Sequence, residues 1–418
     1  MGHACTRLRR GAATATAVGM LMVPLAGGTA RAAPPTSVPG PVTAAPSPTP
    51  SPSASGIRTL GPSVTRQLDR TVRSVLRETR VPGVTVGIWT PHQGRYVRSF
   101  GVADKSTGRR MSPGLYMRIG SETKTFTVTA LLQLADQGKV KLDDPIGKYV
   151  GDVPNGSRIT LRQLAGMRSG LYNYSADPDF FKALTSNPTR HFSPRELLGY
   201  SFRHPALFPP GQKFSYSNTN LVLLGLVVEK ESGRPLGGSI HSGILGPAGM
   251  RNTLFPAGAE FPAPHAQGYT DQTATGKVAD ATGWNTSWGW AAGAMISTLD
   301  DLRVWARTVA TGQFPDGRTM VGPALQKQRL NTPPTPVPGV GYGLGIFDVH
   351  GWVGHNGSLP GYESLTVYYP PARATLVVLL NTDINYRGQE PSTVFGEAIT
   401  KIISPAHVFN LPAEPVAH

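Results

Sequence analysis

Hydrophobic and polar positions follow two distinct patterns near the start of the chain. Apolar residues spaced four apart predict an amphipathic helix over 63–78. A Pro-Gly pair ends that pattern, and the apolar runs 84–89 and 96–102 then predict two strands joined by a turn at 92–94. We therefore expect the fold to begin with a helix packed beside an antiparallel hairpin.

The pattern changes in the middle of the chain, where short helical segments alternate with loops rich in glycine and proline. The clearest helices are predicted over 121–137, 160–166, 194–200 and 219–231. Long strand patterns are missing from this part of the sequence. A mainly helical insert is the simplest interpretation.

Strand patterns return late in the sequence, over 341–349, 351–355, 362–369 and 374–380, and a final helix is predicted at 392–403. Both ends of the chain thus supply strands and flanking helices. A sheet that combines both ends would bury these apolar runs.

The predicted fold class is α/β, with a single large domain over 57–410. An antiparallel sheet flanked by helices would form the α/β lobe from 57–117 and 286–410, and 118–285 would form a mainly α lobe. Ligand sites are common in the cleft between two such units. We therefore expect the functional site between the lobes.

The first 32 residues read as a secretion signal peptide. Three arginines precede the uncharged, mostly apolar stretch 11–25, and Ala30-Arg31-Ala32 offers a small-residue cleavage pattern. A buried N-terminal helix is the alternative. Residues 33–56 are almost entirely Pro, Ala, Ser, Thr, Val and Gly, which predicts a linker with too little apolar surface to fold. We expect a secreted protein.

Composition narrows the function classes. The single cysteine, Cys5, lies within the predicted signal, so disulfides, a cysteine nucleophile and thiolate metal sites are not expected. No apolar run long enough for a membrane span follows the signal. The net charge is +15, but the basic residues are scattered, which disfavours a nucleic-acid partner. A solvated basic surface is the simplest explanation, with cell-wall association as a second one.

Ser121 and Lys124 form the first candidate for chemistry. They lie three residues apart at the start of a predicted helix, so their side chains share one face. Lys124 is the only lysine with a serine three positions before it. A dehydrated lysine can take the serine proton, and the helix N-terminus offers backbone N–H groups to an oxyanion. An N-capping serine beside a solvated lysine would give the same pattern.

Two further motifs follow along the chain. Tyr216-Ser217-Asn218 precedes an apolar helix. Neighbouring cations could lower the pKa of the phenol so that it accepts a proton, and the amide could bind a substrate carbonyl. A buried tyrosine before an N-cap asparagine is the alternative. His355-Asn356-Gly357 ends a strand-like run, and Gly357 would allow a ligand to approach closely. Equivalent His-x-Gly matches at 92–94 and 241–243 lack that context.

The order Ser-x-x-Lys, Tyr-x-Asn, His-x-Gly resembles the penicillin-recognising serine hydrolases, which include class C β-lactamases, DD-peptidases and esterases. The resemblance is closest to secreted actinomycete D-alanyl-D-alanine carboxypeptidases and implies a β-lactamase/DD-peptidase-like fold. It implies that Ser121 is the acylated nucleophile, that Lys124, Tyr216 and His355 complete the catalytic group, and that no metal or cofactor is needed. It also implies a substrate-binding set: Asn218, Asn356, Gly357, Ser358, Trp288 and Phe180. Within this set the resemblance implies that Trp288 and Phe180 form aromatic walls, and that the N–H group of Ser358 forms the oxyanion hole together with that of Ser121.

The resemblance implies a penicillin-sensitive D-alanyl-D-alanine carboxypeptidase, a monomer that acts on peptidoglycan stem peptides and is inhibited by β-lactams. Histidine at 355 disfavours a β-lactamase, which usually has lysine there. Between Arg329 and His355, however, the chain has no Arg or Lys to bind a substrate carboxylate. Asn356, a protonated His355 or Arg168 would have to replace it. A secreted esterase, a D-aminopeptidase, a β-lactamase or a non-catalytic wall-binding protein are the alternatives.

Overall fold

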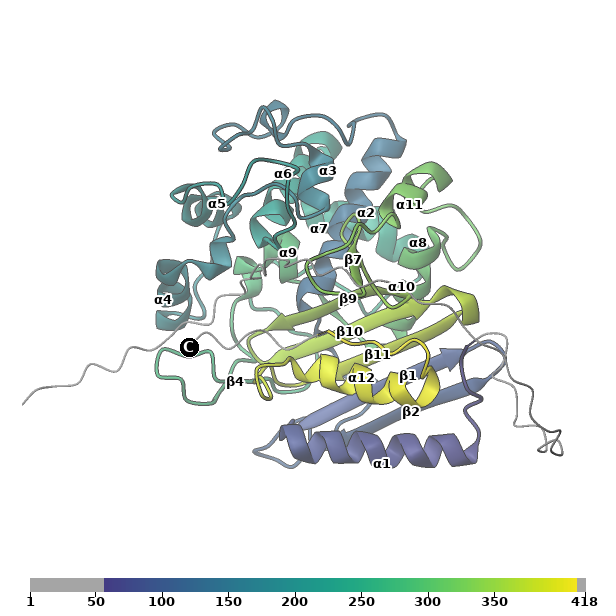
Figure 1. Ribbon diagram of the computed structural model, residues 1–418. Coiled ribbons are helices and arrows are strands. Elements are labelled where there is room, and N and C mark those ends of the chain that lie inside the picture. The colour runs from purple at the N-terminus through teal and green to yellow at the C-terminus, as the bar shows by residue number, and fades with distance from the viewer. Residues whose placement is uncertain (1–55, 412–418) are drawn as a thin grey trace, which may run out of the picture.

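The computed structural model describes residues 56–411 (Figure 1). The predicted signal peptide (1–32) and the predicted linker (33–56), apart from Gly56, lie outside the described residues. In the described part, no helix combines the length and the apolar character needed to cross a lipid bilayer.

A seven-stranded antiparallel sheet forms the centre of the structure, in the order β2-β1-β11-β10-β9-β8-β7. Strands from the two ends of the chain meet in its middle, where Val84 pairs with Leu380. The α/β fold with an antiparallel sheet shared by both ends is therefore confirmed. The strands are β1 (Gly83–Thr90), β2 (Gly94–Gly101), β7 (Val340–Tyr342), β8 (Phe347–Val349), β9 (Trp352–Leu359), β10 (Tyr362–Tyr369) and β11 (Ala374–Leu380).

Helices cover both faces of this sheet, so its central strands are buried on both sides. The helices α1 (Pro62–Thr79) and α12 (Pro391–Ile403) pack together on one face, as Figure 1 shows in purple and yellow. The helix α10 (Leu299–Thr311) contacts β10, β11 and β1. Along β11, Val378 faces the core beneath α1 and α12, whereas Val377 faces the core shared with the helical lobe. This alternation follows from the two-residue period of a strand.

The helical lobe packs around α2, whose side chains are buried on nearly every side. The helix α2 contacts α6, α7 and α9. The helices here are α2 (Thr123–Asp136), α3 (Leu161–Ala165), α4 (Pro178–Ser186), α5 (Pro194–Phe202), α6 (Asn218–Ser232), α7 (Leu236–Ile240), α8 (Gly246–Ala248), α9 (Trp290–Gly293) and α11 (Pro323–Arg329). Two short strand pairs lie outside the main sheet: β3 (Met117–Arg118) with β6 (Ile296–Ser297), and β4 (Tyr269–Thr270) with β5 (Ala279–Asp280).

The structure corrects the predicted strand over 341–349. The chain reverses between β7 and β8, where Gly343 N–H donates to the Ile346 carbonyl and Gly345 has a φ of +66°. Glycine adopts this left-handed conformation at little cost, so two short strands replace one long strand. β9 continues to Leu359, beyond the predicted end at 355, because its second half pairs with β10.

Candidate active site

A sharp turn presents Ser121 between the sheet and the helical lobe. Residues Gly120–Glu122 form a single 3₁₀ turn that leads into α2, and the preceding Ile119 is fixed by its N–H bond to the Met295 carbonyl. Gly120 has a φ of +50°, and a Cβ atom there would lie 2.7 Å from the backbone nitrogen of Ser358. Glycine at this position therefore lets β9 run directly against the turn that carries Ser121.

Lys124 lies one helical turn after Ser121 and is fully buried. A hydrogen bond of 2.8 Å joins its Nζ to Ser121 Oγ, and Nζ also donates to the Ala292 carbonyl at 2.8 Å. Burial lowers the pKa of Lys124 well below its ordinary value. A neutral amine at this distance can accept the serine proton, which a protonated lysine cannot.

Tyr216 lies in the loop before α6, beside this pair. Lys124 Nζ is 4.9 Å from the centre of the Tyr216 ring. The prediction that neighbouring cations lower the pKa of this phenol is wrong. Burial raises the pKa of Tyr216, and its hydrogen bond with Ser121 opposes that effect only in part. Burial also disfavours the charged form of Lys124. Tyr216 therefore suits proton transfer as a neutral phenol.

His355 enters the same cluster from β9 and is 2% exposed. Its Nδ1 lies 2.5 Å from the Asn356 carbonyl, which can only accept, so Nδ1 carries the proton. Nε2 is then the acceptor for the Tyr342 hydroxyl at 3.3 Å. Burial, together with the nearby Lys124, lowers the pKa of His355 to about 3. The imidazole is thus neutral at ordinary pH and cannot bind an anion as a cation.

The strand β9 lies directly against the turn that carries Ser121. A Cβ atom on Gly357 would lie 2.0 Å from the Ile119 carbonyl, so β9 and the nucleophile turn are in direct contact at Gly357 and Ser358. Ser358, whose N–H is a predicted oxyanion donor together with that of Ser121, therefore lies next to the nucleophile turn. The structure joins Ser121, Lys124, Tyr216 and His355 in one cluster; their catalytic roles stay predictions.

The other predicted substrate-binding residues separate into two groups. Asn218, at the start of α6, donates from Nδ2 to Ser175 Oγ at 2.9 Å, while its buried Oδ1 has no hydrogen-bond partner in the described part of the chain. Trp288 is half-buried. Phe180 is 2% exposed, and the centre of its ring lies 6.0 Å from the centre of the Trp288 ring. Phe180 is therefore corrected from a wall of the site to a support behind Trp288.

Asn356 has a partner that the sequence did not suggest. Its Nδ2 donates to Glu390 Oε2 at 2.6 Å, and Glu390 also acts electrostatically to raise the pKa of Tyr216. The site thus contains a carboxylate next to Asn356, where a carboxypeptidase would need a positively charged group to bind its substrate. Arg168, the other proposed anion ligand, donates to the Pro334 carbonyl. No pattern in the sequence links Glu390 to the His355 motif, because the contact depends on how α12 meets β9.

Glu122, next to the nucleophile, is a second unexpected carboxyl group. It is 1% exposed, and burial raises its pKa to about 8, with the Ser364 and Thr366 hydroxyls opposing the shift. Between pH 4.5 and about 8 the folded protein keeps a proton that the unfolded chain releases. Stability should therefore fall as pH rises through this window, by up to about 1.4 kcal/mol per pH unit for this one group.

Glu122→Gln should remove that dependence, because glutamine cannot ionise. We expect its free energy of unfolding, relative to the parent, to increase from pH 5 to pH 8 in urea denaturation. The other buried carboxyl groups are common to both proteins and cancel in the difference. Parallel pH curves for the two proteins would contradict the assignment.

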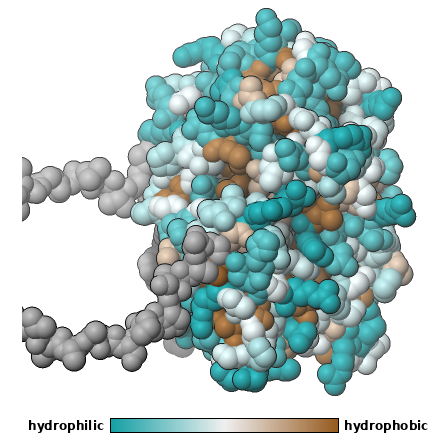
Figure 2. All heavy atoms as spheres, turned by 90° about the vertical axis from the view of Figure 1, so that its right-hand side faces the viewer, coloured by the Kyte–Doolittle hydropathy of each residue, from teal (hydrophilic) through white to brown (hydrophobic). Residues whose placement is uncertain are grey.

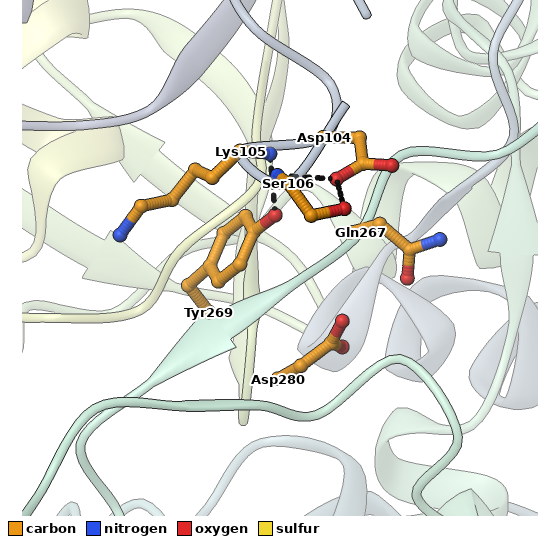
Figure 3. A pocket seen from close by; sticks show the side chains of 6 residues that line it. All are labelled: Asp104, Lys105, Ser106, Gln267, Tyr269 and Asp280. Atoms are coloured by element: carbon orange, nitrogen blue, oxygen red, sulfur yellow. Dashed lines mark hydrogen bonds between the residues drawn. The ribbon is translucent and has the colours of Figure 1, made fainter. Parts of the chain in front are cut away.

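A separate hollow of about 500 Å³ is lined by polar residues from other elements (Figure 3). Its serine, Ser106, donates its hydroxyl proton to Asp104 at 2.7 Å, and the Tyr269 hydroxyl accepts from the Lys105 N–H. Ser106 thus lacks the arrangement that activates Ser121. In residues 56–411 no group of three His, Cys, Asp or Glu side chains is placed to hold a metal ion.

Comparison with known families classifies the chain. The family described as Beta-lactamase matches residues 68–393, which is most of the sequence. The chain belongs to the beta-lactamase family. The resemblance to penicillin-recognising serine hydrolases is thereby confirmed, together with the fold that it implied.

Relatives of this beta-lactamase-family protein include enzymes named for D-amino acids. A D-aminopeptidase of Cereibacter sphaeroides is 29% identical over 75% of the chain; the chain spans 59% of that relative, and less than two thirds of other curated relatives. A D-stereospecific amidohydrolase from Streptomyces sp. has a TM-score of 0.69 at 29% identity, covering 76% of this chain and 94% of that one. A D-amino acid amidase from Ochrobactrum anthropi SV3 has a TM-score of 0.70 at 26% identity, covering 81% of this chain and 96% of that one.

One structural relative is an oligomer. A penicillin-binding protein homologue from Pyrococcus abyssi, with a TM-score of 0.68 and 26% identity over 81% of this chain and 76% of that one, is octameric. Membership of the family therefore does not imply a single subunit. The predicted monomer stays a prediction.

Proposed function

We propose that this protein is a serine amidohydrolase that forms an acyl-enzyme with D-amino acid residues, releasing ammonia or an amine from their amides. The observation that carries this proposal is the Glu390 carboxylate bound to Asn356 beside the catalytic cluster. A carboxylate at this position disfavours the binding of a second, free carboxylate beside it. The relatives named as D-aminopeptidase and D-amino acid amidase support the same substrate class.

The proposed reaction begins with proton transfer from Ser121 Oγ to neutral Lys124 Nζ, across their 2.8 Å contact. Oγ attacks the amide carbonyl, and the N–H groups of Ser121 and Ser358 stabilise the oxyanion; one such donor contributes roughly 10²–10³ in rate. The proton then passes through the Tyr216 hydroxyl to the leaving nitrogen as the C–N bond breaks. Water attacks the ester by the reverse route, which restores Ser121 and releases the acid.

A D-alanyl-D-alanine carboxypeptidase would need to bind the terminal carboxylate of its substrate. His355 is neutral, and Asn356 already donates to a carboxylate. A substrate carboxylate about 6 Å from Glu390 would be repelled by roughly 3 kcal/mol at an effective dielectric constant of 20. Solvent screening at this half-buried position reduces that repulsion to about 1–2 kcal/mol. The carboxypeptidase predicted from the resemblance is thus the weaker reading of this site.

The substrate class can be tested with matched pairs. We expect higher kcat/KM for D-phenylalanine amide than for its L-isomer, and higher kcat/KM for a D-Ala-D-Ala amide than for the same peptide with a free carboxylate. Efficient release of D-alanine from the free acid, without turnover of D-amino acid amides, would overturn the proposal.

Glu390→Gln should reduce the discrimination between amide and free acid. We expect the ratio of their kcat/KM values to fall by about tenfold, the equivalent of 1.4 kcal/mol. Glu397→Gln is the matched control, since Glu397 lies farther along α12 and pairs with Lys401. It makes the same change of charge and should leave the ratio unchanged. An equal effect of both variants would exclude a specific role for Glu390.

A further inference from the structure

A row of side chains crosses four neighbouring strands at the end of the sheet away from Ser358. Arg95 of β2 pairs with Trp89 of β1, Trp89 with Thr375 of β11, and Thr375 with Tyr368 of β10. Residues directly opposite each other in antiparallel strands lie on the same face. The sheet register therefore places these four side chains side by side.

Three more arginines reach this row from two other segments. Arg303 and Arg307 lie one helical turn apart on α10, which packs on the same strands, and Arg373 lies in the turn between β10 and β11. The Arg303 guanidinium is 5.1 Å from the centre of the Trp89 ring. Together the residues line an open hollow of about 390 Å³, here named the arginine groove.

The charge of the arginine groove is unbalanced. Its lining holds four arginines, Arg95, Arg303, Arg307 and Arg373, and no acidic residue. Within the described part of the chain none of the four is in an ion pair. Like charges one helical turn apart destabilise a helix by a few tenths of a kcal/mol. Bound anions would relieve this repulsion.

The size of the groove favours a ligand larger than a single small ion. A volume of about 390 Å³ exceeds the roughly 30 Å³ of one water molecule many times over. Guanidinium groups bind phosphate through paired N–H donors, and here they come from three separate segments. Several phosphate groups spaced along one chain would match that distribution.

We propose that the arginine groove binds an acidic phosphodiester polymer and holds the enzyme on it while the active site stays open. Tyr368 is five residues along β10 from Glu363, the partner of Ser358, a separation of about 17 Å at 3.4 Å per residue. None of the residues that line the groove belongs to the catalytic cluster. The bound polymer therefore leaves the Ser121 site accessible, and this inference does not depend on the proposed substrate.

Binding of synthetic poly(glycerol phosphate) to the full chain, measured by calorimetry over a range of salt concentrations, tests the proposal. For Arg303→Gln/Arg307→Gln we expect about tenfold weaker binding near 0.1 M salt and a logarithmic salt dependence that is shallower by one to two units. Arg66→Gln/Arg70→Gln is the matched control, with the same charge change at the same spacing on the exposed side of α1. The control should bind like the parent, and both variants should keep the parent's amidase activity.

Three outcomes would overturn the proposal. Equal losses in the two double variants would show that net charge alone attracts the polymer. Binding of poly-D-glutamate as strong as that of poly(glycerol phosphate) would show that the groove does not select phosphate. Saturation by inorganic phosphate at the same affinity per site would indicate a small-ion site instead of a polymer site.

Discussion

Replacement of Ser121 by alanine is expected to lower kcat/KM for a D-amino acid amide by about 10⁴-fold or more. The variant lacks the oxygen that forms the acyl bond, and no other hydroxyl takes its place 2.8 Å from Lys124 Nζ among the hydrogen bonds of residues 56–411. Ser121 is half-buried and its loss leaves no large cavity, so the fold should remain intact. Steady-state kinetics and circular dichroism would measure both properties.

Intact-mass analysis gives an independent readout of the same residue. We expect a single acyl adduct on the parent after acid quenching of its reaction with an activated ester of a D-amino acid, and none on Ser121→Ala. Ser106→Ala is a suitable control, because it removes a serine hydroxyl from the separate hollow while leaving the catalytic cluster unchanged. An adduct that persists in Ser121→Ala would show that another residue is acylated.

Lys124→Met should cause the second largest loss, about 10³–10⁴-fold in kcat/KM, because methionine keeps the buried volume but cannot accept a proton. Lys124→Arg should be equally inactive, since a guanidinium stays protonated. The parent requires neutral Lys124, so its activity should fall as the pH drops through the lowered pKa of this amine. The measurement is kcat/KM against pH for all three proteins.

The remaining activity of Lys124→Met should lack the acid limb that the parent shows. His355 should add no inflection near pH 6.5, because its pKa is lowered to about 3. A parent profile with a single inflection near 6.5 that disappears in His355→Gln would assign the essential base to the imidazole and contradict the role of Lys124.

The sequence predicted those parts of the site that depend on local geometry. Ser121 and Lys124 share a helix face whatever surrounds them, because three residues make nearly one turn. Hydrophobic periodicity likewise predicted the helices over 194–200 and 219–231 and the strands over 362–369 and 374–380. The structure confirms them to within a few residues. The two-ended sheet followed from where strand patterns occurred along the chain.

The features that sequence could not supply depend on contacts between distant segments. The Ala292 carbonyl that binds Lys124 is a backbone group and leaves no side-chain signal. Tyr342 and Glu390 reach the site only through the register of β7 to β9 and the entry of α12. Burial determines the direction of the Tyr216 pKa shift, and a sequence motif does not show whether a side chain is buried. Phe180 was predicted as a wall of the site from its residue type, but in the structure it packs behind Trp288.

The pairing of Val84 with Leu380 also has a consequence for the order of events during biosynthesis. The first hairpin leaves the ribosome long before β11 exists, and contacts at such long range form slowly. Until β9 is complete, Ser121 and Lys124 are already synthesised but lack the strand that carries Ser358, the second predicted oxyanion donor. The nascent polypeptide therefore cannot act as a hydrolase until the late strands of the sheet have been synthesised and have folded.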